Sequence, residues 1–104
     1  MQIHFIEKEK DFKRLAADAN RWESGNWAVT PEVAEEAVGG DIFFHKQRTS
    51  PSYFGGKVLS FRQTESDAGE VRVVFEFEMT QGHRGQKTDR KGWTSETKII
   101  RESA

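Results

Sequence analysis

A stretch rich in glycine, aromatic and β-branched residues, residues 39–63, constrains the fold more than any other part of the chain. It contains a Gly-Gly-Asp turn, an apolar run that ends at His45, a polar loop with a proline, and a second Gly-Gly pair followed by another apolar run. Glycine pairs are typical of turns and bulges, whereas aromatic and β-branched residues favour pleated backbone. We therefore expect two adjacent strands, residues 42–47 and 57–64, with a functional loop between them.

The clearest strand pattern follows a turn at residues 67–70, where Asp-Ala-Gly-Glu interrupts the chain. From residue 71 to residue 80, apolar side chains alternate with charged or polar ones, which is typical of a strand with one buried face. The short connection predicts that this strand pairs antiparallel with residues 57–64 as a hairpin.

The N-terminal part contains two different periodicities of apolar residues. Residues 2–6 alternate as a half-buried strand does, whereas apolar residues recur at helical spacing over residues 11–22. The second pattern predicts an amphipathic helix that buries Trp22 in the core and ends near Gly25. A short strand over residues 26–29 then leads to a second helix, whose N-cap is Thr30 and whose first residue is Pro31.

Residues 82–92, Gly-His-Arg-Gly-Gln-Lys-Thr-Asp-Arg-Lys-Gly, contain no apolar side chain and predict a solvated loop. Residues 93–101 return as a last strand. Two early helices and five or six mostly antiparallel strands predict an α+β domain, with a sheet that is strongly curled or closed into a small barrel.

Composition limits the class of protein. The 104 residues are expected to form a single domain, residues 1–104, and the absence of cysteine favours a reducing compartment, which we take to be the cytoplasm. No apolar run approaches the ~20 residues that a membrane-spanning helix needs, so we expect no membrane partner. We also expect the protein to be a monomer. Sixteen Lys and Arg against seventeen Asp and Glu give a net charge of -1. Any contact with nucleic acid must therefore be local.

Three segments resemble the PUA-like superfamily, in particular its EVE and ASCH branches: Gly-Asp-Ile-Phe-Phe-His at 40–45, Gly-Gly-Lys-Val-Leu at 55–59, and Asn-Trp-Ala-Val-Thr-Pro-Glu at 26–32. The chain looks like a shortened and divergent member, because Pro31 and Glu32 stand in reversed order and a strand and helix precede the matched part. The resemblance implies a small curled antiparallel β-barrel with two N-terminal helices. It also implies a noncatalytic pocket for a nucleobase, often a modified one, or for an RNA or DNA segment.

Candidate ligand-binding residues gather around the first strand of residues 39–63 and its loop. A flat base held on an aromatic ring, with polar groups at its edge, is how single-stranded bases are recognised, and each stack contributes about 1–3 kcal/mol. The predicted ligand-binding residues, at the mouth of the expected barrel, are Trp27, His45, Lys46, Arg48, Ser52, Tyr53 and Trp93. Core packing is the alternative role of the aromatic residues, and a structural role is the alternative for His45.

The polar loop supplies candidate phosphate contacts, Arg84, Lys87, Arg90 and Lys91, against one acidic residue, Asp89. Its alternative role is that of a solvated loop. With three histidines on separate segments and no cysteine, we predict no metal site, and we predict no cofactor.

Two other functions compete with base binding. ASCH-like hydrolysis of modified nucleosides would need a lysine beside a carboxylate, and Lys46 or Lys57 with Glu76 or Glu78 is the pairing available. A protein-interaction domain with an exposed aromatic patch is the other alternative. No catalytic residue is predicted, because lysine and glutamate on neighbouring strands usually form ordinary surface pairs.

Overall fold

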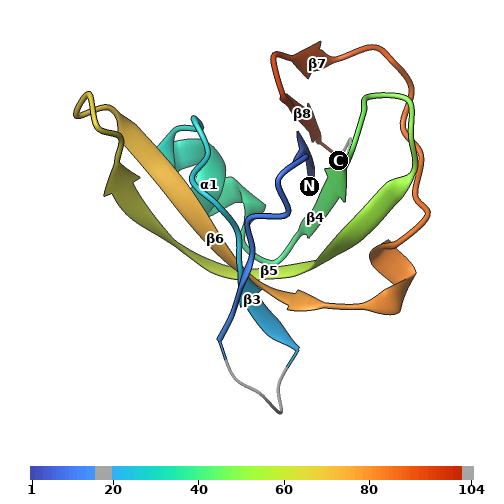
Figure 1. The fold of residues 1–104 in the computed structure, drawn as a ribbon, viewed down its shortest axis with the longest axis horizontal. Helices are drawn as coiled ribbons and strands as arrows, with labels where there is room; N and C mark the ends of the chain where they lie inside the picture. The colour runs from blue at the N-terminus through green and yellow to red at the C-terminus, as the bar shows by residue number, and fades with distance from the viewer. Residues whose placement is uncertain (16–19, 102–104) are drawn as a thin grey trace.

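The computed structural model describes residues 1–15 and 20–101, and Figure 1 shows its ribbon. In this part of the chain, eight strands form one sheet with one α-helix beside it. In chain order the elements are β1 (Gln2–Ile6), β2 (Lys13–Arg14), β3 (Arg21–Glu23), α1 (Pro31–Ala37), β4 (Asp41–His45), β5 (Ser52–Glu65), β6 (Val71–Met79), the 3₁₀ helix η1 (Gln81–His83), β7 (Trp93–Thr94) and β8 (Thr97–Ile100).

The strand order is β2-β3-β6-β5-β4-β1-β8-β7, and all neighbours pair antiparallel except β1 and β4, which run parallel. The prediction of a closed barrel is wrong, because within residues 1–15 and 20–101 no pairing joins the edge strands β2 and β7. Both edge strands are only two residues long, so they offer few backbone groups with which to close the sheet.

The predicted helix over residues 11–22 is also wrong where the structure describes it. β2 and β3 form a hairpin there, and β3 pairs with β6, with Trp22 opposite Phe77. Residues 16–19 of the predicted helix lie outside the described residues. Long-range pairing with β6 overrides the helical spacing of the apolar residues, because propensity and periodicity are weak against tertiary packing.

Two further elements differ from the prediction. Residues 26–29 make only an isolated bridge between Trp27 and Val73, and residues 93–101 form a hairpin of β7 and β8 instead of one strand. Ser95, at the tip of that hairpin, has a positive φ of 56°. The predicted fold of a barrel with two N-terminal helices is therefore replaced by an open, mostly β structure with a single α-helix in the described part.

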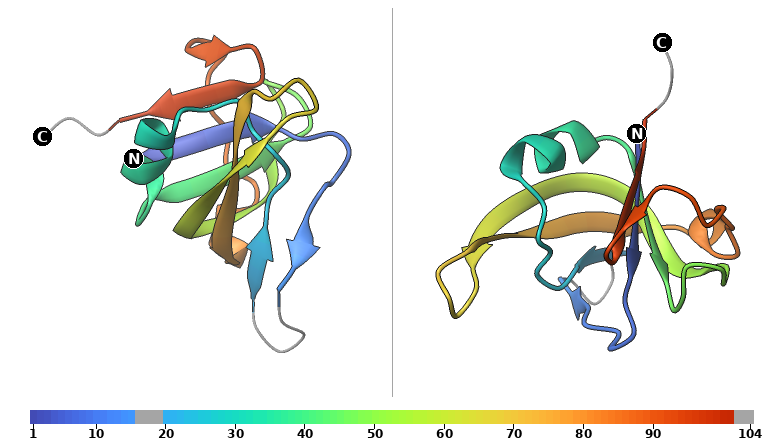
Figure 2. Two further views of the ribbon diagram at one scale, coloured as in Figure 1. Left: turned by 90° about the vertical axis from the view of Figure 1, so that its left-hand side faces the viewer. Right: turned by 90° about the horizontal axis from the view of Figure 1, so that it is seen from above.

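Two other local signals are confirmed, whereas half of the loop expected between residues 47 and 57 is strand, because β5 already begins at Ser52. α1 begins at Pro31, and the Thr30 side chain accepts a hydrogen bond from the Val33 backbone N–H at 3.2 Å. β5 and β6 form the predicted antiparallel hairpin, with Glu65 opposite Val71. Figure 2 shows both strands as long, strongly curved ribbons, with α1 beside them. The register shifts between Val58 and Ser60, where an irregularity lets β5 bend.

The curved sheet surrounds an aromatic core. Phe5 stacks on Trp27 at 4.1 Å between ring centroids, and Phe12 meets Phe44 edge-on at 4.7 Å. The largest fully buried apolar side chains come from β1, β4 and β6, and they are Ile3, Phe5, Ile42, Phe44, Phe75 and Phe77. No helix in the described residues is long and apolar enough to cross a membrane.

Candidate functional site: an aromatic groove with basic residues at its rim

A groove of about 330 Å³ opens where the β2–β3 hairpin faces the start of β5. Four aromatic rings line it, those of Phe12, Trp22, Tyr53 and Phe54, and three cationic side chains complete the lining. Phe12 and Trp22 both meet the Phe54 ring edge-on, at centroid distances of 4.9 and 5.3 Å. We call these four rings and the cations Lys10, Lys46 and Arg84 the aromatic groove.

Tyr53 reaches the groove because the β4–β5 ladder is irregular at that point. Phe44 pairs with Phe54, but the next partner of β4, His45, pairs with Ser52, which leaves Tyr53 as the extra residue of a bulge. A bulge re-aims a side chain relative to the regular alternation of a strand. The Tyr53 hydroxyl donates to the Glu7 carbonyl oxygen at 2.6 Å, which fixes the ring, and burial together with the Glu7 carboxyl raises the pKa of Tyr53.

Phe12 and Trp22 reach the groove through the hairpin that the sequence pattern had not indicated. Phe12 follows a tight turn in which its N–H donates to the Lys10 carbonyl oxygen at 2.9 Å, and Lys10 itself adopts a positive φ of 54°. Trp22 lies in β3, paired with Phe77 on one side and Arg14 on the other. The local sequence around a half-buried aromatic residue does not tell whether its side chain lines a groove or packs in the core.

Cationic side chains lie close to the aromatic rings of the groove. The ammonium nitrogens of Lys10 and Lys46 lie 5.8 and 6.0 Å from the centroid of the Tyr53 ring. The guanidinium of Arg14 lies 5.7 Å from the Trp22 ring, and that of Arg84 lies 6.0 Å from the Phe54 ring. All four side chains belong to exposed residues, so they can reach an anion beside the rings as well as the ring faces.

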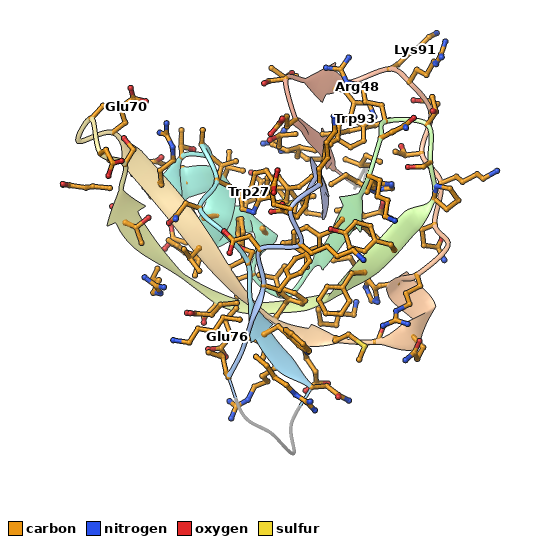
Figure 3. All side chains as sticks on the ribbon, in the orientation of Figure 1. Trp27, Arg48, Glu70, Glu76, Lys91 and Trp93 are labelled. Atoms are coloured by element: carbon orange, nitrogen blue, oxygen red, sulfur yellow. The ribbon has the colours of Figure 1, made fainter. Side chains whose placement is uncertain are left out.

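The structure thus brings three of the predicted site residues, Lys46, Tyr53 and Arg84, into one groove. It places His45 elsewhere, fully buried within the sheet. Figure 3 shows Trp93, a residue of β7, in the upper part of the molecule and Trp27 nearer its centre.

His45 is one member of a buried histidine pair. Its Nε2 lies 2.9 Å from Nδ1 of His4, and its Nδ1–H donates to the Ser50 carbonyl oxygen at 2.9 Å. The Trp93 ring meets both imidazoles edge-on, and Phe43 stacks on His4 at 4.6 Å. The pairing follows from the parallel register of β1 and β4, in which the two strands lie side by side.

The hydrogen bonds of this histidine pair limit which of its ring nitrogens can carry a proton. His45 donates from Nδ1 to a carbonyl, so a neutral His45 accepts at Nε2 and His4 donates from Nδ1. Nε2 of His4 then accepts, and the Gln2 amide must turn its NH₂ group toward it. With the Gln2 Oε1 facing Nε2 at 3.1 Å, His4 has to carry a second proton.

Burial disfavours the doubly protonated, charged form of His4. Burial, followed by the nearby charges of His45 and Lys98, lowers the pKa of His4 to about 4. Burial also lowers the pKa of His45, partly offset by its hydrogen bond to the Ser50 carbonyl. The pair is therefore neutral at pH 7, which suits an internal structural element better than a ligand contact.

Ser52 also has a structural role. It is buried, and its hydroxyl donates to the His83 carbonyl oxygen at 2.6 Å and accepts from the Gln86 N–H at 3.0 Å. These bonds fasten the polar loop to β5. Of the predicted phosphate contacts, Arg84 lines the aromatic groove, Arg90 lines a second hollow with Arg48, and Lys87 and Lys91 are exposed along the same loop.

Trp27 lines a third hollow of about 680 Å³ between residues 26–30, α1 and the β7–β8 hairpin. One face of its indole is covered by Phe5, and the side chain is 8% exposed. Arg72 and Glu96 supply opposite charges to this hollow, whose floor includes Val29 and Ile99. It is large enough for a small ligand, but it carries no excess of positive charge.

The residues needed for hydrolysis lie in a different place. Lys57 faces Glu78 across the β5–β6 ladder, but its Nζ pairs with the Asp41 carboxylate at 2.8 Å. Asp41 also accepts from Nε2 of His83 at 2.8 Å, and Nδ1 of His83 contacts the Thr80 hydroxyl. This hydroxyl, imidazole and carboxylate resemble a catalytic triad, but none of the three hollows described above includes them.

Hydrogen bonds from Lys57 and His83 lower the pKa of Asp41 against the opposing effect of burial, so its carboxylate stays ionised as an ion-pair partner. In the described residues, no group of three or more His, Asp or Glu side chains is placed to hold a metal ion.

Comparisons with protein-family models, with curated proteins and with solved structures found no match to this chain. The resemblance to the PUA-like superfamily therefore stays a prediction. The geometry of the hollows is the remaining basis for a functional proposal.

Proposed function

We propose that the protein is a noncatalytic binding module for a nucleobase or nucleotide, including modified bases, presented as a free nucleoside or within RNA or DNA. The base stacks in the aromatic groove, and the cations at its rim contact phosphate. We further propose that the protein works as a monomer in the cytoplasm, in keeping with its lack of cysteine.

The aromatic groove is the single observation that supports this function. It combines the buried Phe54, three half-buried aromatic side chains and three lining cations, and no carboxylate lines it. The whole chain has a net charge of -1, so this concentration of positive charge is local and not a consequence of composition. Stacking on aromatic rings with Lys or Arg nearby is the physical pattern by which proteins hold unpaired bases.

The groove also separates this proposal from the two alternatives. A protein-interaction surface would be centred on an apolar patch, whereas three of the seven side chains that line this open groove are cations. Among residues 1–15 and 20–101, the exposed large apolar side chains are Leu15, Val38, Leu59 and Val71, and none of them lines the aromatic groove. A hydrolase would need its lysine and carboxylate beside a substrate cavity. Lys46 lines the aromatic groove, but no carboxylate does, and Lys57, Glu76 and Glu78 lie outside the three hollows.

Replacing Tyr53 by leucine should weaken nucleotide binding about tenfold, because it removes one stacking face worth about 1–3 kcal/mol. The measurement is an amide chemical-shift titration with the four nucleoside monophosphates and with ribose 5-phosphate. In the unmodified protein, saturable shifts should appear at Phe12, Trp22 and Phe54 with nucleotides and not with ribose 5-phosphate.

Trp93→Leu is the matched control, since it removes a partly buried aromatic ring outside the groove. It should leave the nucleotide affinity unchanged. The proposal is wrong if no shift moves at millimolar nucleotide. It is equally wrong if the shifts gather at Trp27 and Val29, because the base would then occupy the hollow beside α1.

A further inference from the structure

A second hollow, of about 590 Å³, is lined by polar and charged residues apart from Ile6. Lys8, Arg48 and Arg90 supply positive charge, and Glu96 is the carboxylate in the lining. The Arg48 guanidinium donates to the Ser95 carbonyl oxygen at 2.7 Å, which holds it at the edge of the hollow. We call this the basic hollow. Its chemistry suits phosphate and sugar oxygens, and it has no aromatic ring on which a base could stack.

The basic hollow and the aromatic groove share three segments of the chain. Two of them, residues 7–10 and 46–49, follow the ends of the parallel strands β1 and β4, where the Glu7 N–H donates to the His45 carbonyl oxygen at 2.8 Å. The third is the polar loop, residues 82–92. Two sites on shared segments can hold different parts of one ligand.

Each segment contributes one cation to each site. Along residues 7–10, Lys8 lines the basic hollow and Lys10 lines the aromatic groove. Along residues 46–49, Arg48 lines the hollow and Lys46 the groove. The polar loop gives Arg90 to the hollow and Arg84 to the groove. Six cations and one carboxylate, that of Glu96, line the two sites, which is an excess of positive charge on a protein whose net charge is -1. Glu9 and Asp89 lie on the same segments but line neither site. We call the two sites together the basic strip.

We infer that this strip binds a single-stranded nucleic acid, with a base in the aromatic groove and the backbone of the adjoining nucleotides in the basic hollow. The inference rests on the proposed function and names its ligand. A free nucleoside fills only the groove and leaves the three cations of the hollow without a partner from the ligand. A duplex keeps its bases stacked in pairs, so it cannot offer a base face to the rings.

The test measures affinity against length, with a mononucleotide and with oligonucleotides of two, four and eight residues, as RNA and as DNA. Affinity should rise at least tenfold between the mononucleotide and the tetranucleotide. The logarithm of the affinity should fall with the logarithm of salt concentration by about 0.7 for each phosphate contact. The RNA and DNA series show which backbone the hollow accepts.

The decisive variant is the double replacement Arg48→Gln with Arg90→Gln. It should weaken tetranucleotide binding about tenfold, reduce the salt slope by about 1.4, and leave mononucleotide binding unchanged. The matched control, Arg62→Gln with Arg101→Gln, changes the net charge equally at two exposed ion-paired arginines outside both sites. It should leave the tetranucleotide affinity within twofold.

Several results would overturn the inference and leave the proposed function intact. One is a mononucleotide that binds as tightly as the tetranucleotide while Tyr53→Leu weakens both. Another is an unchanged tetranucleotide affinity in the Arg48→Gln and Arg90→Gln double variant. Heparin or polyphosphate binding as tightly as the tetranucleotide would show a general polyanion strip and also overturn the inference. Failure of every nucleotide and oligonucleotide to bind would overturn the proposed function as well.

Discussion

Replacing Gly56 by alanine is expected to lower the free energy of unfolding by roughly 3 kcal/mol or more, because the backbone of β6 occupies the space of the new methyl group. A Cβ at this position would lie 1.9 Å from the Glu78 carbonyl oxygen and 2.6 Å from its carbon. These are backbone atoms of the neighbouring strand, so no side chain can turn away. The two strands must separate at the point where β5 curves.

Gly82→Ala is the matched control for this substitution. A Cβ at Gly82 meets only the Thr80 Oγ1, at 3.9 Å, which is ordinary contact, so its effect should stay within about 0.5 kcal/mol. Urea unfolding followed by circular dichroism measures both variants. Equal midpoints for the two variants would show that β5 and β6 can separate at Gly56 without cost, and the account of the curved sheet given above would be wrong.

Gly55 has the same constraint on the other side of β5, since its Cβ would lie 2.3 Å from the Ile42 carbonyl oxygen. The backbone of β5 therefore comes close to β4 at Gly55 and close to β6 at Gly56. The sequence indicated that this pair marks a bend or bulge. It did not indicate which strands come close, because that depends on pairings between residues far apart in the chain.

The same distinction explains which elements could be predicted. The alternation in β6 and the cap of α1 are local patterns, and both were read correctly. The helical spacing over residues 11–22 is local as well, but pairing between β3 and β6 outweighs it. The parallel pairing of β1 with β4 has no local signal, and the open sheet depends on it.

The candidate site follows the same rule. Lys46 and Tyr53 lie in the stretch that the sequence singled out, and they line the aromatic groove. Trp22 and Phe12 belong to the apolar face of the predicted helix, and Phe54 is not among the predicted site residues, so three of the four aromatic rings in the groove are not predicted. Finding Phe12 and Trp22 would have required a hairpin prediction for residues 11–22. The buried partner of His45 was missed for a similar reason, because His4 reaches it only through the β1–β4 register.

The histidine pair should make the protein lose stability in mild acid. His4 has a pKa of about 4 in the folded protein against 6.5 when unperturbed. Between these values the unfolded chain binds more protons than the folded one, so the free energy of unfolding falls as the pH decreases from 6.5 toward 4. A pKa difference of this size is worth roughly 2–3 kcal/mol for His4, and the lowered pKa of His45 adds in the same direction.

Other ionisable groups act in different ranges or in the opposite direction. Burial raises the pKa values of Asp41, Glu23 and Asp89, but hydrogen bonds from their cationic partners outweigh it, so all three pKa values are lowered. Their stabilising contribution is present above pH ~4.5 and is lost only below it. Burial raises the pKa of Glu7, whose contribution therefore increases in acid. The decline between pH 6.5 and 4.5 is thus assigned to the histidine pair.

Urea unfolding from pH 4.5 to 7.5 tests this assignment with two variants. His4→Gln removes one imidazole but can still donate to Nε2 of His45, so the decline between pH 6.5 and 4.5 should shrink to the part that His45 contributes. Phe43→Leu loosens the ring stacked on His4 and keeps both imidazoles, so it should lower stability by about 1 kcal/mol at every pH and preserve the decline. A flat profile in the unmodified protein would mean that the pair accepts protons without losing its bonds. The Gln2 amide offers the route, because its Oε1, 3.1 Å from Nε2 of His4, accepts a hydrogen bond from a protonated imidazole within the folded sheet.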